Sequence, residues 1–185
     1  MIDHTHRAIF IHQRKVAGMS IMRTFGFQPE NPDFHLFNDG VLSAEWRDRD
    51  ARVRGYFVIS AVRNPFDRLI SGWKYLAATA NRPLLDVLLD PPREGHDYRH
   101  LTRPQIAILR DPTTGQLIVD DLIRFESLQA DFDRVCARIG APRSILPHVN
   151  MSMRERDYRA YFDARTRRLA EIMFAEDLAV FNYQF

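Results

Sequence analysis

A buried strand that runs directly into a helix start constrains the fold of this chain most strongly. Residues 56–62, Tyr-Phe-Val-Ile-Ser-Ala-Val, form a nearly continuous apolar run that is typical of a buried strand. Asn64, Pro65 and Asp67 then supply an N-cap, a proline at the first helical position and an acid in the first turn. Arg63 is therefore predicted at the carboxyl end of a strand, where open α/β sheets bind their ligands.

A second strand-to-helix junction lies near the N-terminus. Residues 7–12 predict a short buried strand, and Ile21 with Phe25 gives the following helix an inward face. The turn holds Lys15, one of only two lysines in a chain whose other basic residues, apart from histidine, are arginines. A helix opening at about 18–20 would aim backbone N–H groups at a phosphate, and an ammonium group can follow a single oxygen. Taken alone, the junction is equally typical of a buried first strand followed by a surface lysine.

The later part of the chain continues this alternation. Short strands are predicted at 118–119 and 122–125, and helices at 128–139 and 164–175. Strands that alternate with helices predict an α/β fold, with a mostly parallel sheet covered on both sides. The two junctions would then offer two anion sites at one edge of the sheet. Ser71, two helical turns after Asn64, would face the same side as the start of its helix.

Composition limits the class of protein. The 185 residues, 45% of them apolar, predict a single globular domain over 1–185. A net charge of only +2, with arginines spread along the chain, argues against a nucleic-acid partner. Cys136, the only cysteine, occupies a helical core position, so neither a disulfide nor a thiolate metal site is expected. No signal or membrane span is predicted, which indicates a cytoplasmic protein, with peripheral membrane association and oligomeric state left open.

Both junctions resemble a known family. Residues 10–20 resemble the 5′-phosphosulfate loop of the carbohydrate-type sulfotransferases (sulfotransferase family 2), which use 3′-phosphoadenosine 5′-phosphosulfate (PAPS). Residues 57–71 are similar to the 3′-phosphate motif of that family. Its C-terminal segments are matched at 123–128, 146–152 and 181–185. The resemblance covers nearly the whole chain and implies a three-layer, P-loop-like fold, with a mostly parallel central sheet flanked by helices.

The resemblance also implies a donor site. The implied cofactor-binding residues are Arg14, Lys15, Val16, Ala17, Gly18, Met19, Ser20, Arg63, Ser71 and Ser152. Lys15 is the implied catalytic cation, because it can stabilise the charge that grows on the leaving phosphate, and no metal is expected. The chain departs from the family at Val16 and Met19, where threonines are frequent, and at Gln13 and Arg14, which replace Ile-Pro. Because the two threonine hydroxyls are missing, weaker donor binding and loss of activity both stay open.

The acceptor side is implied by residues 94–105, which match the acceptor-side segment of the family. His100 is the preferred general base for a hydroxyl of a carbohydrate or small-molecule acceptor, with His96 and Glu94 as alternatives. Each of the three is also compatible with a solvated surface role. Asn64, Pro65 and Asp67 need no role beyond starting a helix.

Two other functions stay open. A P-loop nucleotide kinase would share the fold class, but it needs G-x-x-x-x-G-K-[ST], and here Lys15 precedes the glycine. A catalytically impaired, nucleotide-binding relative is the second alternative, suggested by the altered loop.

Overall fold

The computed structural model describes residues 1–26, 51–147 and 157–185. The chain divides into two compact units, unit 1 with Met1–Val62 and Ala107–Val149, and unit 2 with Arg63–Ile106 and Asn150–Phe185. The expectation that residues 1–185 act as a single sulfotransferase domain stays a prediction.

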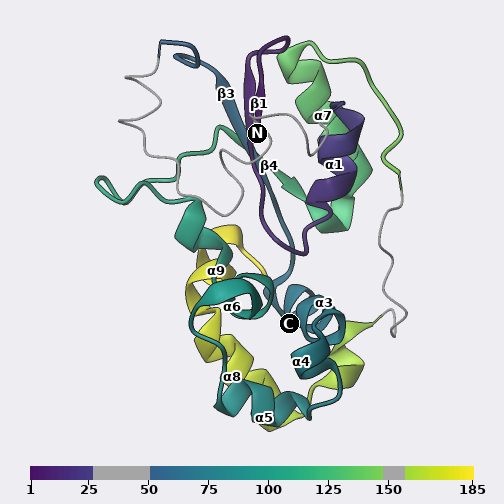
Figure 1. Cartoon of the computed structure of the whole chain (residues 1–185), viewed down its shortest axis with the longest axis vertical. Helices are drawn as coiled ribbons and strands as arrows, with labels where there is room; N and C mark the ends of the chain where they lie inside the picture. Colours follow the sequence, from purple (N-terminus) through teal and green to yellow (C-terminus); the bar gives the residue numbers. More distant parts are fainter. Residues whose placement is uncertain (27–50, 148–156) are drawn as a thin grey trace. The chain divides into compact units, whose positions relative to one another are not determined.

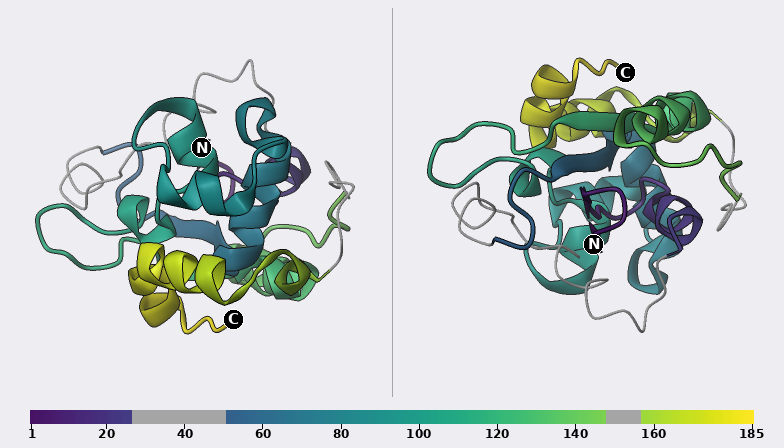
Figure 2. Two further views of the ribbon diagram at one scale, coloured as in Figure 1. Left: turned by 90° about the horizontal axis from the view of Figure 1, so that it is seen from below. Right: turned by 90° about the horizontal axis from the view of Figure 1, so that it is seen from above.

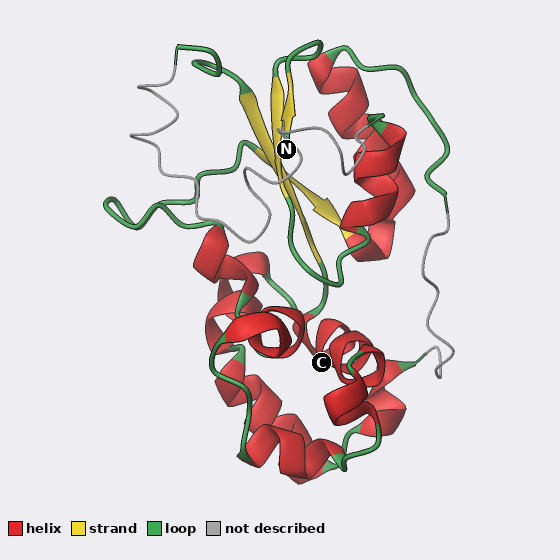
Figure 3. Ribbon diagram, viewed as in Figure 1, coloured by secondary structure: helices red, strands yellow, loops and turns green. Residues whose placement is uncertain are grey.

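Unit 1 holds the sheet (Figures 1 and 3). Its strands are β1 (Ile2–Asp3), β2 (Ala8–Ile11), β3 (Phe57–Val62) and β4 (Asp121–Arg124), in that spatial order. The β1 strand pairs antiparallel with β2, whereas the β2/β3 and β3/β4 pairs are parallel. The mostly parallel sheet of an α/β fold is thus confirmed, with β2 and β3 at the positions that the apolar runs predict.

The strand predicted at 118–119 is wrong. These residues lie in a loop between an isolated bridge at Leu117 and the start of β4. The physical reason is Asp120, which pairs with β3 through both its backbone and its side chain. Its N–H donates to Val58 O at 2.8 Å, and its carboxylate accepts from Val58 N at 2.7 Å. The ladder therefore begins only after Asp120.

Two helices cover one face of this sheet. The helices α1 (Gly18–Thr24) and α7 (Leu128–Ile139) lie on the same side of the strands (Figure 2, right). Phe25, at the end of α1, packs against Phe132 of α7 with ring centroids 5.3 Å apart. Cys136 is buried in the same core, as predicted, and burial raises the pKa of its thiol. The α7 helix ends at Gly140, whose φ of 73° is the left-handed conformation that glycine accepts without strain.

Unit 2 is helical in its described part. It contains α3 (Pro65–Tyr75), α4 (Ala77–Ala80), α5 (Leu84–Leu89), α6 (Gly95–Leu101), α8 (Ala164–Met173) and α9 (Ala175–Phe181), with short 3-10 helices at Gln105–Ile108 and Tyr158–Tyr161. The helix predicted at 164–175 is confirmed as α8, which ends at Met173, and a further helix that was not predicted, α9, follows after the buried Phe174. Across the described residues, no helix has the length and apolar character needed to cross a membrane.

Candidate active site

The loop between β2 and α1 has an unusual backbone. Lys15 and Ala17 adopt φ angles of 68° and 63°, in the left-handed region that L-residues seldom occupy. Alternation of this kind turns backbone N–H groups toward a common point, where an anion can bind. Ala17 is also the N-cap of α1 and gives no side-chain hydrogen bond to the helix start. The loop predicted to bind phosphosulfate therefore has the backbone form of an anion site.

Packing from within unit 1 fixes the shape of this loop. Val16 is fully buried in the core, so its backbone, rather than its side chain, is what the loop presents. The Gln13 amide donates to Ala61 O of β3 at 3.3 Å. His12 lies against the first residue of α1, since a Cβ added at Gly18 would stand 2.2 Å from the imidazole. Gly18 is thus required by close contact, while Arg14 and Lys15 are half-buried.

The second junction forms as the sequence predicts, with one addition. The Asn64 side chain accepts from Phe66 N at 3.0 Å, which confirms it as the N-cap of α3. Asp67 does more than favour the helix start. Its carboxylate accepts from Arg63 Nε at 2.8 Å and lies 2.7 Å from a terminal guanidinium nitrogen. Ser71 follows one helical turn after Asp67 and is buried, so α3 carries Asp67 and Ser71 on the face that continues from Arg63.

Arg63 is also held by its backbone. The Gln105 amide oxygen accepts from Arg63 N at 2.9 Å, and the amide nitrogen donates to Arg63 O at 2.9 Å. Asp177 of α9 accepts in turn from the N–H groups of Gln105 and Ile106, at 2.7 and 2.9 Å. A carboxylate, an amide and a strand end are thus joined within unit 2.

Burial shifts the pKa values of two charged residues at the clamp that Gln105 forms through its contacts with Arg63 and Asp177. Burial raises the pKa of Asp177, against the opposing effect of the Arg68 guanidinium and the N–H donors. Burial likewise lowers the pKa of Arg68 to about 10. Arg68 donates to Arg103 O and lies over the Phe174 ring, while its Nε has no hydrogen-bond partner among the described residues. Charges so deeply buried are fixed in place by their surroundings.

The preferred base candidate is built into α6. His100 is buried, and its ring packs against the rings of Tyr75 of α3 and His96, with centroid distances of 5.5 and 4.1 Å. Its Nδ1 lies 3.0 Å from His96 O. A carbonyl oxygen can only accept, so Nδ1 carries the hydrogen and Nε2 is the basic nitrogen of the neutral ring. Glu94, by contrast, is an exposed residue at the start of α6.

A glycine lets α6 approach α3 closely. A Cβ added at Gly72 would stand 2.4 Å from His100 O, a distance that the backbone of α6 does not allow. His100 is therefore fixed against the helix that carries Ser71. Ser152, the remaining predicted donor ligand, lies outside the described residues. The expectation that the Lys15 loop and the Arg63 junction hold one nucleotide stays a prediction.

A comparison with protein families bears on the region that holds these two junctions. A family model described as "Sulfotransferase family" matches residues 1–184. The chain belongs to the sulfotransferase family. The resemblance of the loop and of the Arg63 motif is thereby confirmed over nearly the whole length of this sulfotransferase, which makes sulfuryl transfer its general chemistry. Searches of curated proteins and of solved structures found no match.

Three features of the site were not predicted from the sequence of the sulfotransferase. The pairing of Arg63 with Asp67 had a signal, since opposite charges four residues apart meet on a helix face. Gln105 was assigned only to the acceptor-side segment. Its contact with Arg63, and that of Asp177 with Gln105, join residues far apart in the chain, which no local pattern indicates.

Proposed function

We propose that this sulfotransferase moves a sulfuryl group from PAPS to a hydroxyl of a carbohydrate or small-molecule acceptor. The observation that supports this best is a family match that spans a left-handed loop carrying Lys15 and a strand end carrying Arg63. The proposal includes the three-layer, P-loop-like form of the fold that the resemblance implies.

Lys15 and its loop would bind the end of the donor that reacts. An acceptor oxygen attacks sulfur in line while the bond from sulfur to the bridging oxygen of the 5′-phosphate breaks. Negative charge then grows on that oxygen, and the Lys15 ammonium with backbone N–H groups of the loop would stabilise it. The transferred group bears less charge than a phosphoryl group, so cationic side chains would do what magnesium does in kinases.

Arg63 and Ser71 would bind the 3′-phosphate. A guanidinium is a planar fork that matches phosphate oxygens, and a hydroxyl can donate alongside it. Asp67 accepts from Arg63 Nε at 2.8 Å, which fixes the plane of the fork. Because charge-assisted hydrogen bonds contribute roughly 1.5–3 kcal/mol each, this site would discriminate strongly for a 3′-phosphorylated nucleotide.

His100 would take the proton of the acceptor hydroxyl. The hydrogen bond from Nδ1 to His96 O leaves Nε2 as the nitrogen that can accept a proton. The rings of Tyr75 and His96 pack against the imidazole, so its orientation is set before an acceptor arrives. His96 itself is exposed, which makes it the second choice.

The direct test is turnover of PAPS by the purified protein with a panel of neutral and acidic sugars, in the presence of EDTA. We expect release of 3′-phosphoadenosine 5′-phosphate that depends on an acceptor, and a sulfated product by mass spectrometry. Consumption of ATP that requires magnesium, without turnover of PAPS, would favour the kinase alternative. Nucleotide binding without turnover of any donor would favour the impaired relative.

A further inference from the structure

We propose that Gln105 is a positioning residue for recognition of the 3′-phosphate of the donor, and that Asp177 holds Gln105 in place. The inference rests on the proposed role of Arg63 as a ligand of that phosphate. Gln105 and Asp177 would thus serve donor recognition, and neither would contact the acceptor or the reacting sulfur.

The contact between Gln105 and Arg63 imitates a strand pair. The amide accepts from Arg63 N and donates to Arg63 O, both at 2.9 Å, as the backbone of a neighbouring strand would. Gln105 is 1% exposed and Arg63 is 6% exposed, so water does not compete for these bonds. Arg63 is the first residue after β3, and the amide satisfies both of its backbone groups at that point.

Asp177 holds the backbone at Gln105 in place. Its carboxylate accepts from the N–H groups of Gln105 and Ile106, and its Oδ2 lies 3.4 Å from the Gln105 amide nitrogen. Asp177 is fully buried on α9, with the Arg68 guanidinium as the charge that stabilises its ionised form. Two of these donors are backbone groups, so the carboxylate chiefly fixes the segment from which the Gln105 side chain extends.

This clamp acts on the ligand through geometry. The Arg63 guanidinium is fixed at its far end by Asp67, and the backbone is fixed by Gln105. Loss of either hold would let the fork shift, and hydrogen bonds weaken steeply as distance and angle depart from their optimum. A shift of Arg63 would weaken binding of the 3′-phosphate and would not directly change binding of the 5′-phosphate.

The chain contains a matched control in unit 1. Gln129 forms the same kind of two-point contact, because its amide accepts from Leu146 N at 2.9 Å and donates to Ser144 O at 3.0 Å. None of the residues in that contact is a candidate ligand or base. Gln129→Met therefore removes an amide clamp of the same chemistry at a place where no nucleotide group is expected.

The test compares two nucleotides in three proteins by calorimetry. Affinities for 3′-phosphoadenosine 5′-phosphate and adenosine 5′-phosphate are measured for the wild type, Gln105→Met and Gln129→Met. In Gln105→Met we expect the affinity for the 3′-phosphorylated nucleotide to fall about tenfold, with that for adenosine 5′-phosphate within about twofold of wild type. Gln129→Met should leave the ratio of the two affinities at the wild-type value.

The outcomes separate the inference from the function it rests on. If the ratio of the two affinities in Gln105→Met equals the wild-type ratio, whether or not both affinities fall, only the role of Gln105 is overturned. Equal affinities in the wild type would overturn the proposed 3′-phosphate site and the role of Gln105 with it. Thermal unfolding shows which variants fold. If Gln105→Met does not fold, Gln105→Asn takes its place. The shorter amide cannot reach both Arg63 N and Arg63 O, so this variant should also lower the ratio of the affinity for 3′-phosphoadenosine 5′-phosphate to that for adenosine 5′-phosphate.

Discussion

Lys15 and Ala17 hold a backbone conformation that costs an L-residue roughly 1–2 kcal/mol. Such a conformation persists only where its surroundings determine it, and here the buried Val16 and the Gln13 amide supply that constraint. The loop is therefore shaped before a ligand binds. Pre-formed N–H donors stabilise a developing charge without the cost of reorganisation.

Replacement of Lys15 should damage the chemical step more than donor binding. We expect Lys15→Ala to lower kcat by about a hundredfold or more, because the ammonium would act on charge that appears only as the bond from sulfur to the 5′-phosphate breaks. Lys15→Arg should restore little, since a wide planar fork cannot occupy the same point. Steady-state kinetics with a verified acceptor, together with calorimetry of the nucleotide, measures both quantities.

The other lysine provides the control. Lys74 lies on α3 with its ammonium 3.8 Å from the centre of the Trp73 ring, outside the proposed site. Lys74→Ala should keep the wild-type kcat. Should Lys15→Ala also turn over at the wild-type rate, Lys15 would be a surface cation and the proposed mechanism would be wrong.

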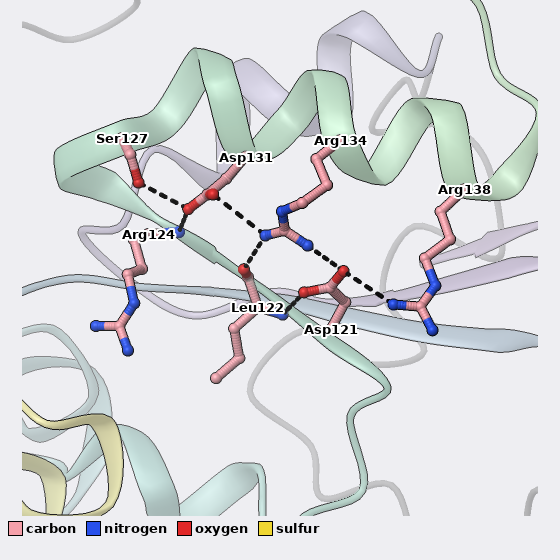
Figure 4. A network of polar contacts seen from close by, with 7 residues as sticks. All are labelled: Asp121, Leu122, Arg124, Ser127, Asp131, Arg134 and Arg138. Atoms are coloured by element: carbon pink, nitrogen blue, oxygen red, sulfur yellow. Dashed lines mark hydrogen bonds and ion pairs between the residues drawn. The ribbon is translucent and has the colours of Figure 1, made fainter.

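At the scale of elements, a polar network joins β4 to α7 (Figure 4). Asp131 accepts from Arg124 N and from the Ser127 hydroxyl, each at 2.8 Å, and pairs with Arg134 at 3.2 Å. Arg134 also reaches Asp121 at the start of β4. The network fixes the turn from the last strand into α7, the helix that covers the sheet.

Asp131 gives this junction a predictable dependence on pH. Burial alone would raise its pKa, but the hydrogen bonds from Arg124, Ser127 and Arg134 outweigh burial and lower the pKa below its ordinary value. Because the folded-state pKa is the lower one, the unfolded chain binds this proton first as the pH falls. The stability that Asp131 contributes is therefore complete above the unfolded pKa of about 3.9 and is lost as the pH falls through the folded value.

Asp131→Asn should therefore be destabilising at neutral pH only. We expect the free energy of unfolding to fall by about 1 kcal/mol at pH 7, and the difference from wild type to shrink toward zero below about pH 4. Urea unfolding at pH 7 and pH 3 measures it. Asp86→Asn, which changes an exposed acid in the first turn of α5, serves as the control and should have little effect at either pH. An equal difference at both pH values for Asp131→Asn would exclude the charge as the cause.

At the scale of the whole molecule, the sequence predicted those features that depend on neighbouring residues. The two main strands, the N-cap at Asn64 and the helix end at Gly140 were all confirmed, because apolar runs, capping side chains and left-handed glycines act locally. The family match confirmed the resemblance of both junctions.

Features that depend on contacts between distant residues could not be predicted from local sequence patterns. The late start of β4 follows from a contact between Asp120 and Val58. The clamp of Gln105 on Arg63 likewise joins side chains that lie far apart in the sequence. Periodicity carries no information about such pairs.

We propose that this sulfotransferase recognises a 3′-phosphorylated adenosine donor through cationic side chains. Calorimetry of the wild type with 3′-phosphoadenosine 5′-phosphate and with adenosine 5′-phosphate, each in EDTA, tests it most directly. We expect the first nucleotide to bind at least about tenfold tighter, because Arg63 and Ser71 would add charge-assisted hydrogen bonds, and we expect no change in affinity when magnesium is supplied. Equal affinities for the two nucleotides, or binding that appears only when magnesium is restored, would contradict it.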